Sequence, residues 1–193
     1  MTIDDILEFW FGVPGSDDAT YQARRKLWFR KNPETDQTIR DRFLTVYEQA
    51  IAHQRDDWQV TPKGSLALTL VLDQFPRNMF RDTPKAFASD AQARDVAQKA
   101  IDQGFDQNVP PLQRFFFYLP LEHSEDLSDQ EQSVYLSRKL FDACPDLADT
   151  YDYAVRHKDV IEQFGRFPHR NAILGRESTA EELDFLKQPG SSF

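Results

Sequence analysis

The fold is decided by the stretch Thr61-Pro62-Lys63-Gly64-Ser65-Leu66-Ala67-Leu68-Thr69-Leu70-Val71-Leu72-Asp73-Gln74-Phe75-Pro76. Thr61 is a good N-cap, and proline suits the first helical position because the N–H that it lacks has no intrahelical partner there. The run from Pro62 to Phe75 is apolar on nearly every side, which predicts a helix at the buried centre of the molecule. The proline after Phe75 predicts that this helix ends there.

The segments on either side have helical periodicity as well. Their apolar residues recur at spacings of three and four, and proline, glycine or capping residues separate one segment from the next. A helix is predicted to begin at Pro110-Pro111, and Pro120 must kink or end it. Capping boxes are predicted at Ser128–Glu131 and at Ser178–Glu181. The whole pattern predicts about nine or ten helices and no pair of strands.

Length and charge narrow the class of protein. A chain of 193 residues fits a single domain, here residues 1–193. It has 23 basic and 32 acidic residues, a net charge of -9, so we expect neither nucleic acid nor an anionic membrane surface as a partner. The single cysteine, Cys144, excludes an internal disulfide. The N-terminal residues do not resemble a signal peptide, and no apolar run reaches the length that spans a bilayer, so we expect a cytoplasmic protein.

Two segments of the chain resemble each other. Val71-Leu72-Asp73-Gln74-Phe75 is echoed by Val160-Ile161-Glu162-Gln163-Phe164. A proline turn with arginine and asparagine follows each, namely Pro76-Arg77-Asn78 and Pro168-His169-Arg170-Asn171. We refer to residues 71–81 as the first echo and to residues 160–176 as the second. The likeness fits a duplicated helix pair, and it fits equally the independent use of one turn chemistry at two helix ends.

The two echoes gather basic side chains in an acidic protein. The arginines concerned are Arg77, Arg81, Arg166, Arg170 and Arg176. A guanidinium group matches phosphate or carboxylate oxygens bidentately, which predicts an anion clamp. The alternative is structural, because arginine also binds the carbonyls left open at helix C-termini. We take Arg77, Arg81, Arg166 and Arg170 as ligand-binding candidates, together with their polar neighbours Asn78, His169 and Asn171.

A polar, titratable segment, Leu121-Glu122-His123-Ser124-Glu125-Asp126, emerges from an apolar helix just after Pro120. Three interpretations stay open for it. His123 could act as a general base or acid oriented by a carboxylate, the acids and His123 could bind a divalent metal, or the acids could simply pair with the echo arginines. Motifs of the Glu-x-x-His and His-Glu-x-x-His kind are absent, so we assign no metal and keep Glu122 and Glu125 as ligand-binding candidates.

Two further titratable residues lie on apolar helices. His157 falls on the apolar side of a long helix, where it is either a satisfied core residue or a second group that moves a proton. Asp73 lies on the most buried helix and therefore needs a partner, and we count it among the ligand-binding candidates. The chain lacks a phosphate-binding Walker loop, a dinucleotide glycine fingerprint and a Gly-x-Ser-x-Gly elbow, so we expect no cofactor.

Five motifs of the chain are distinctive. They are Ile6-Leu7-Glu8-Phe9-Trp10-Phe11-Gly12, Leu72-Asp73-Gln74-Phe75-Pro76-Arg77-Asn78, Tyr118-Leu119-Pro120-Leu121-Glu122-His123-Ser124-Glu125, Phe164-Gly165-Arg166-Phe167-Pro168-His169-Arg170-Asn171 and the closing Pro189-Gly190-Ser191-Ser192-Phe193. Together they resemble a known bacterial family, the domain of unknown function 924. The resemblance covers essentially the whole chain. It implies an all-α fold of helices packed as antiparallel pairs in a tetratricopeptide-like superhelical bundle. It implies no activity and no catalytic residues.

Two hypotheses follow for function. The first is a site for a small anionic ligand, phosphate- or carboxylate-bearing, in a hydrolase whose protons are moved by His123 or His157. The second is a tetratricopeptide-like scaffold that binds a peptide or protein partner in a concave groove. A separate expectation concerns the chain end, where the carboxylate of Phe193 could dock on the arginines or simply fray.

Overall fold

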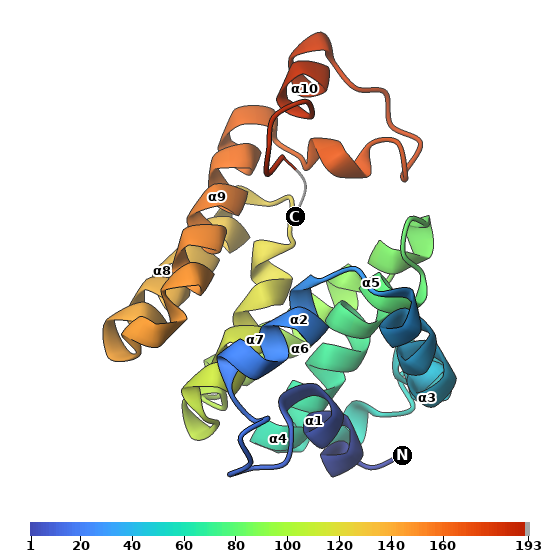
Figure 1. The fold of residues 1–193 in the computed structure, drawn as a ribbon, viewed down its shortest axis with the longest axis vertical. Coiled ribbons are helices and arrows are strands. Elements are labelled where there is room, and N and C mark those ends of the chain that lie inside the picture. Colours follow the sequence, from blue (N-terminus) through green and yellow to red (C-terminus); the bar gives the residue numbers. More distant parts are fainter. Residues whose placement is uncertain (192–193) are drawn as a thin grey trace.

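The structure is a computed structural model that describes residues 1–191. The regular secondary structure of these residues is entirely helical, without a strand (Figure 1). The all-α prediction is therefore confirmed for the described part of the chain. The expectation for Phe193 falls on a residue outside it. Among the described residues, no helix combines the length and the apolar character needed to cross a membrane.

The described chain forms ten α-helices joined by shorter helical turns. The α-helices are α1 (Ile3–Phe11), α2 (Tyr21–Phe29), α3 (Pro33–Ile51), α4 (Pro62–Thr69), α5 (Phe75–Met79), α6 (Asp90–Asp102), α7 (Pro111–Glu122), α8 (Leu127–Ala143), α9 (Ala148–Phe164) and α10 (Ala180–Phe185). The short turns are η1 (Asp56–Val60), η2 (Leu70–Gln74), η3 (Pro84–Phe87), η4 (Asp106–Asn108), η5 (Pro145–Leu147) and η6 (Pro168–Arg170). All are 3-10 turns except η2, which is a π turn.

Local sequence explains where the central helix α4 begins. The Thr61 hydroxyl accepts a hydrogen bond from the Gly64 N–H at 3.1 Å, and Pro62 occupies the first turn. Only glycine fits at position 64, because a Cβ atom there would lie 2.2 Å from the carbonyl oxygen of Trp58. The start of the buried helix is thus set by a cap, a proline and a close backbone contact.

Aromatic side chains fill the core around α4. Trp10, Phe43, Phe75 and Phe116 are all essentially inaccessible to solvent. Phe43 and Phe75 have ring centroids 4.6 Å apart, and Trp10 lies 5.4 Å from Phe75 and 6.0 Å from Phe116. Each such side chain contributes roughly 1.5–3 kcal/mol by leaving water. Helices α1, α3, η2–α5 and α7 are therefore held to one another mainly by these rings.

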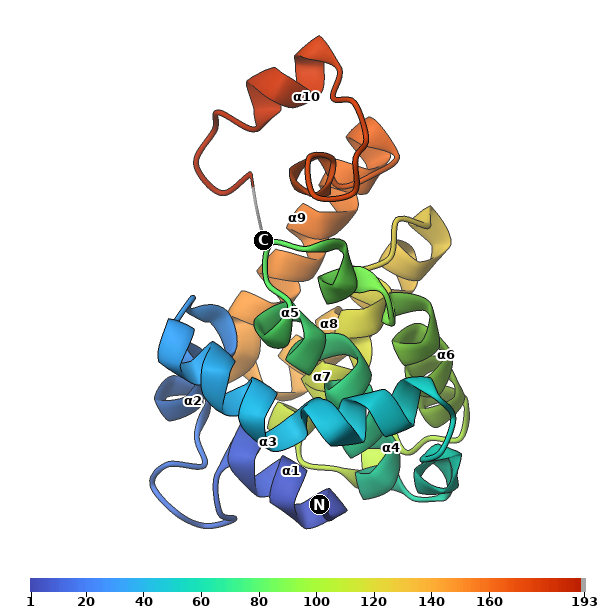
Figure 2. The ribbon, with the colours of Figure 1, turned by 90° about the vertical axis from the view of Figure 1, so that its right-hand side faces the viewer.

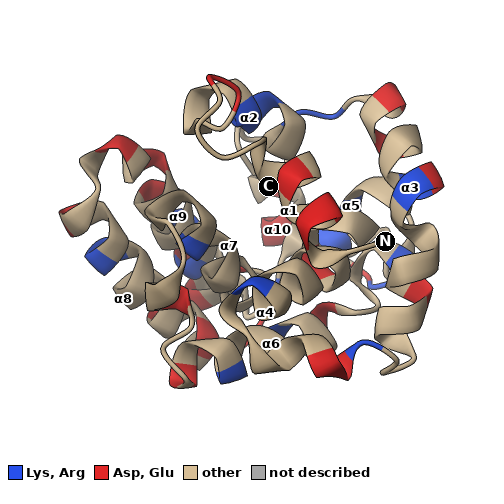
Figure 3. Ribbon diagram, turned by 90° about the horizontal axis from the view of Figure 1, so that it is seen from below, with Lys and Arg blue, Asp and Glu red and all other residues tan. Residues whose placement is uncertain are grey.

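The helices surround the core on all sides. Helices α8 and α9 run as an antiparallel pair along one side, and α3 lies on the opposite side of α5 and α7 (Figures 1 and 2). Helix α10 and the segment before it occupy one end of the long axis, and α1 lies at the other end. Acidic and basic segments are spread over several helices (Figure 3).

The helix end predicted at Phe75 is wrong, and helix α7, which was predicted to kink or end at Pro120, does not end there. The central helix does not stop at Phe75, because the π turn η2 carries the chain into α5 and through Pro76. Helix α7 likewise continues past Pro120 to Glu122. Gln130 fixes the end of this helix, because its Nε2 donates to the carbonyl oxygen of Glu122, the last helical residue, at 2.6 Å and to that of Ser124, just beyond it, at 2.7 Å.

Both predicted capping boxes are displaced. Helix α8 is capped by Asp126, whose carboxylate accepts from the Ser128 N–H at 2.8 Å, so Ser128 is not the cap. Helix α10 is capped by Thr179 together with Glu182, one residue after the predicted pair. The Ser178 hydroxyl is used elsewhere, because it accepts a hydrogen bond from Asn171 at 3.0 Å. Neighbouring residues with similar capping ability make such shifts invisible in sequence.

Candidate functional site

The site begins at the π turn η2 in the middle of the central helix. Pro76 has no N–H, so the carbonyl of Leu72 loses its usual helical donor, and the Ser89 hydroxyl donates to that carbonyl instead, at 2.6 Å. The N–H of Phe75 bonds to the carbonyl of Leu70, five residues back. Single π turns are often found at functional sites, because they change the direction of the side chains that follow. Here the turn contains Asp73.

Asp73 and His123 form a buried hydrogen-bonded pair. His123 Nδ1 lies 2.8 Å from Asp73 Oδ1, and Gln74 Nε2 donates to Asp73 Oδ2 at 2.7 Å. Arg77 adds an ion pair at 3.3 Å from Asp73 Oδ1. The Asp73 side chain is 1% exposed and that of His123 is 14% exposed. The carboxylate is thus enclosed, while part of the imidazole ring reaches the open space beside it.

The environment sets the charge of this pair. Burial opposes ionisation of Asp73, but Arg77 and His123 outweigh it, so the Asp73 pKa lies below its ordinary value. Burial and the positive charge of Arg77 lower the pKa of His123. Asp73 is therefore ionised and His123 neutral at neutral pH. Because a carboxylate only accepts hydrogen bonds, the His123 proton resides on Nδ1 and the Nε2 lone pair is left to accept a proton.

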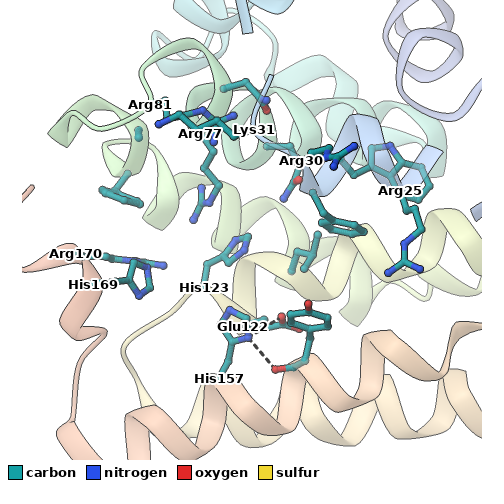
Figure 4. A pocket seen from close by; sticks show the side chains of 18 of the residues that line it. Arg25, Arg30, Lys31, Arg77, Arg81, Glu122, His123, His157, His169 and Arg170 are labelled. Carbon is teal, nitrogen blue, oxygen red and sulfur yellow. Dashed lines mark hydrogen bonds and ion pairs between the residues drawn. The ribbon is translucent and has the colours of Figure 1, made fainter. Parts of the chain in front are cut away.

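A second histidine–carboxylate pair lies directly below the first (Figure 4). His157 Nδ1 lies 2.8 Å from the carbonyl oxygen of Tyr153 and 3.1 Å from Glu122 Oε1. The rings of His123 and His157 are 6.3 Å apart. Burial, with the nearby charge of Asp73, raises the Glu122 pKa to about 8. Burial also lowers the pKa of His157 well below its ordinary value.

Glu122 is consequently a protonated acid at neutral pH, close to an ionised Asp73. Its Oε2 atom is buried without a hydrogen-bond partner among the described residues. Two carboxyl groups whose surroundings push their pKa values apart are the usual basis for assigning acid and base roles. The pair of dyads can therefore accept a proton at His123 and release one from Glu122.

Arg170 is the least neutralised cation next to these dyads. Its NH1 atom lies 3.4 Å from Asp90 Oδ2, and Asp90 is also bound bidentately by Arg77 at 2.8 and 3.1 Å. Arg170 instead stacks over the rings of Phe87 and Phe167, at 4.8 and 4.6 Å from their centroids. Its Nε atom is buried without a hydrogen-bond partner in the described chain. Burial and the charge of Arg77 lower its pKa to about 10, so it remains a cation.

These groups border a cavity of about 550 Å³ (Figure 4). Among the described residues, its lining contains six basic side chains and two acidic ones. They are Arg25, Arg30, Lys31, Arg77, Arg81 and Arg170 on the basic side, and Asp82 and Glu122 on the acidic side. Four of the six basic side chains are paired with acids, Arg25 with Asp149, Lys31 with Asp82, Arg77 with Asp90 and Arg81 with Asp36. Arg170 is thus the basic group of the lining next to the dyads that its neighbours neutralise least. The volume is in the range of small-molecule sites.

Most of the residues singled out from the sequence come together here. The cavity is lined by Arg77, Asn78, Arg81, Glu122, His123, His157, His169 and Arg170. Asp73 lies behind the wall and contacts His123. Two of the lining residues are also structural ties, because Arg81 binds Asp36 with two bonds of 2.8 Å and Asn78 donates to the same carboxylate at 2.8 Å.

Besides Asp73, three predicted ligand-binding residues do not line this cavity. Arg166 binds Glu182 at 2.6 and 2.8 Å, and Asn171 donates to Glu182 at 3.1 Å. Glu125 accepts two bonds from Arg176, at 2.7 and 2.9 Å, and one from the Phe167 N–H at 2.8 Å. Glu125 borders a smaller hollow of about 380 Å³, which His123 and Arg170 also line. Glu125 is thus paired with an echo arginine, whereas Arg166 and Asn171 are held by the Glu182 carboxylate and not by the helix C-terminal carbonyls of the structural alternative.

Sequence reasoning missed one whole wall of the cavity. Helix α2 and the residues after it contribute Tyr21, Arg25, Trp28, Phe29, Arg30 and Lys31. The run Trp28-Phe29-Arg30-Lys31 places aromatic and basic side chains together at a helix end, and this was the available signal. The sequence contained no comparable signal for Asp90, which contacts both Arg77 and Arg170. In the described residues, no group of three or more His, Cys, Asp or Glu side chains is arranged to hold a metal ion.

Comparison with known proteins gives the relationship of the chain. The model of a family described as a bacterial protein of unknown function (DUF924) matches residues 6–190. A solved structure of a protein of unknown function from Agrobacterium tumefaciens is similar, with 39% identity, a TM-score of 0.84 and 96% of each chain covered. The search of curated proteins found no match. The chain belongs to the DUF924 family of bacterial proteins.

Proposed function

We propose that the cavity binds a small anionic ligand, phosphate- or carboxylate-bearing, and that the protein is a hydrolase acting on an ester of that acid. The observation that supports this most directly is Arg170. It is a buried cation with a single long contact to an acid that Arg77 already neutralises. A buried charge without full pairing is costly, and an anion in the cavity would remove that cost.

The two dyads supply the proton transfers that such a hydrolysis needs. A water molecule attacks the carbonyl carbon or the phosphorus of the bound ester, and its proton passes to His123 Nε2. Asp73 holds the imidazole in the required tautomer through the 2.8 Å contact at Nδ1. The leaving oxygen takes the proton of Glu122, which His157 holds from 3.1 Å. Arg170 and Arg77 would stabilise the negative charge that develops.

Binding is tested with inorganic phosphate and acetate by calorimetry and thermal unfolding. We expect saturable binding, and Arg170→Met should weaken it at least about tenfold, because a charge-assisted contact is lost. Arg166→Met is the matched control, since Arg166 lies in the same echo but does not line the cavity. A ligand at a hundred times its Kd adds about 2.7 kcal/mol of stability, which thermal unfolding detects. Absence of binding, or equal binding by Arg170→Met, would refute the proposed site.

Turnover is tested with p-nitrophenyl acetate and p-nitrophenyl phosphate. We expect one of the two to be hydrolysed and His123→Gln to lower kcat by about a hundredfold or more. His53→Gln is the control, because His53 is exposed, pairs with Asp56 and does not border the cavity. A rate that is unchanged in His123→Gln would exclude His123 as the base. No turnover of either ester would leave binding as the only supported part of the proposal.

The alternative function, a scaffold that binds a peptide in a concave groove, has less support. It needs an exposed groove, whereas Glu122, His123 and His157 are drawn into the base of a cavity and are nearly inaccessible. A peptide would reach these groups only through a side chain or a terminus. The polar chemistry of the site therefore favours a small ligand.

A further inference from the structure

One wall of the cavity is aromatic and lies away from the two dyads. Tyr21, Trp28 and Phe29 come from α2, and Phe115 comes from the start of α7. Successive ring centroids are close, at 6.0 Å for Tyr21 and Trp28, 5.9 Å for Trp28 and Phe29, and 6.4 Å for Phe29 and Phe115. We call these four residues the aromatic wall.

Phe29 is unusual among the phenylalanines of this chain. It is 52% exposed, and no other phenylalanine in residues 1–191 is comparably exposed. Trp28 anchors the helix, because its Nε1 donates to the carbonyl of Trp10 at 2.9 Å and its ring packs 4.9 Å from Phe116. Neighbouring helical residues point about 100° apart, so Phe29 cannot enter the same core site. Its half-exposed ring therefore lies in the wall of the cavity, where an apolar group of a ligand would cover it.

Helix α7 relates this wall to the dyads. Phe115, Leu119 and His123 are spaced by four residues, which places them along one face of the helix, and all three line the cavity. At 1.5 Å per residue, Phe115 and His123 are about 12 Å apart along the helix axis. The aromatic wall and the acid–base groups therefore occupy opposite ends of an elongated space, with Leu119 between them.

We propose that the ligand is an amphiphilic arylalkyl anion. Its phosphate or carboxylate group contacts Arg170 beside His123, its short alkyl chain passes Leu119, and its aromatic ring packs against Phe29 and Phe115. This inference rests on the proposed function, and it specifies the substrate class of the same site. An anion without the apolar part would leave the half-exposed ring of Phe29 in contact with water, at a cost proportional to its exposed area.

The test compares three phosphate monoesters by calorimetry: methyl phosphate, phenyl phosphate and 4-phenylbutyl phosphate. A fourth probe, 5-phenylpentanoate, replaces the phosphate by a carboxylate. We expect 4-phenylbutyl phosphate to bind at least about tenfold more tightly than methyl phosphate, with phenyl phosphate between them, because only the longest probe spans the distance along α7. Tight binding of the carboxylate probe alone would support the aromatic end and assign the head group as a carboxylate.

Two variants test whether the gain in affinity comes from contact with the aromatic wall. Phe29→Ala should bring the affinity for 4-phenylbutyl phosphate to within about twofold of that for methyl phosphate, and should leave methyl phosphate unaffected. Because Phe29 is half exposed, this variant is expected to remain folded, which circular dichroism verifies. Tyr135→Ala is the control, since Tyr135 is also an exposed aromatic residue, at 57%, but does not border the cavity.

The outcomes separate this inference from the proposed function. If methyl phosphate binds through Arg170 but the longer probes bind no more tightly, the arylalkyl ligand is refuted and the anion site stands. If affinity rises with length but Phe29→Ala does not reduce it, the assignment to the aromatic wall is refuted. If no probe binds, inorganic phosphate included, both proposals are refuted.

Discussion

The two echoes share a turn sequence, but their acidic residues lie in different environments. In both, the arginine within the proline turn contacts Asp90. Arg77 binds it at 2.8 and 3.1 Å, and Arg170 lies 3.4 Å from it. In both, a later arginine is bound bidentately by a carboxylate from another element, Arg81 by Asp36 and Arg176 by Glu125. Arg77 and Arg81 of the first echo and Arg170 of the second line the cavity, and Arg81 and Arg176 also fasten their turns.

The difference lies in the acidic residue before the turn. Asp73 of the first echo is buried in the π turn and contacts His123 and Arg77. Glu162, its counterpart in the second echo, has a 46% exposed side chain and pairs with Lys158 on the surface of α9. Helix α9 ends at Gly165 in a left-handed conformation, with φ of 67°, so its chain turns away where the first echo continues. Arg170 therefore lacks the buried acid that neutralises Arg77, which suits it to bind an anion.

The largest difference between the echoes should appear when their acidic residues, Asp73 and Glu162, are replaced one at a time. Asp73→Asn should lower the free energy of unfolding by about 4 kcal/mol, because Arg77 and His123 lose a buried ionised partner. Glu162→Gln should change it by less than about 0.5 kcal/mol, since exposed pairs are screened by water. Urea unfolding at pH 7, followed by circular dichroism, measures both. Similar losses in the two variants would show that the echoes are energetically equivalent.

A smaller effect is expected in the way the free energy of unfolding depends on pH. The Glu122 pKa is about 8 in the folded protein against an ordinary value of 4.5. Between these values the unfolded chain loses its Glu122 proton and the folded protein keeps it, so this group costs stability as the pH rises. Glu122→Gln has no such proton, and its stability relative to the wild type should rise by about 3 kcal/mol from pH 5 to pH 8.

Urea unfolding at several pH values measures this difference, and the two echo acids again provide the contrast. In an Asp73→Asn background the rise should be smaller, because the charge of Asp73 helps to raise the Glu122 pKa. In a Glu162→Gln background it should be unchanged. Parallel pH profiles for the wild type and Glu122→Gln would show that Glu122 is not protonated in the folded protein.

The smallest effects should come from Ser89 and Gly165, which support the backbone at the π turn and at the end of α9. Ser89→Ala removes the donor to the Leu72 carbonyl in the first echo and should cost about 2 kcal/mol, because a buried acceptor is left unsatisfied. Gly165→Ala in the second echo should cost about 1 kcal/mol, because only glycine adopts this φ without strain. Gly165→Asn should cost less, since asparagine tolerates that conformation. Thermal unfolding compares the three, and a neutral Ser89→Ala would mean that the π turn does not depend on this hydroxyl.

The site was only partly accessible from the sequence. The polar run around His123 and the echo arginines were visible because their residue types are unusual beside apolar helices. The pairing of Asp73 with His123 was not, because the two residues are 50 positions apart in the chain. The π turn was missed for a related reason, since proline in a sequence predicts a helix end and the Ser89 hydroxyl that compensates for it comes from a distant segment.

Apolar spacing, capping residues and prolines determined by themselves that the described chain is all helical and that its centre is the helix starting at Pro62, because these signals act over one or two turns. Only the tertiary structure decided which charged groups are neutralised. Asp90 lies 13 residues from Arg77 and 80 residues from Arg170, and their meeting depends on how the helices pack. The free energy of a buried charge is set by its neighbours in space, and packing brings those neighbours together across the whole chain.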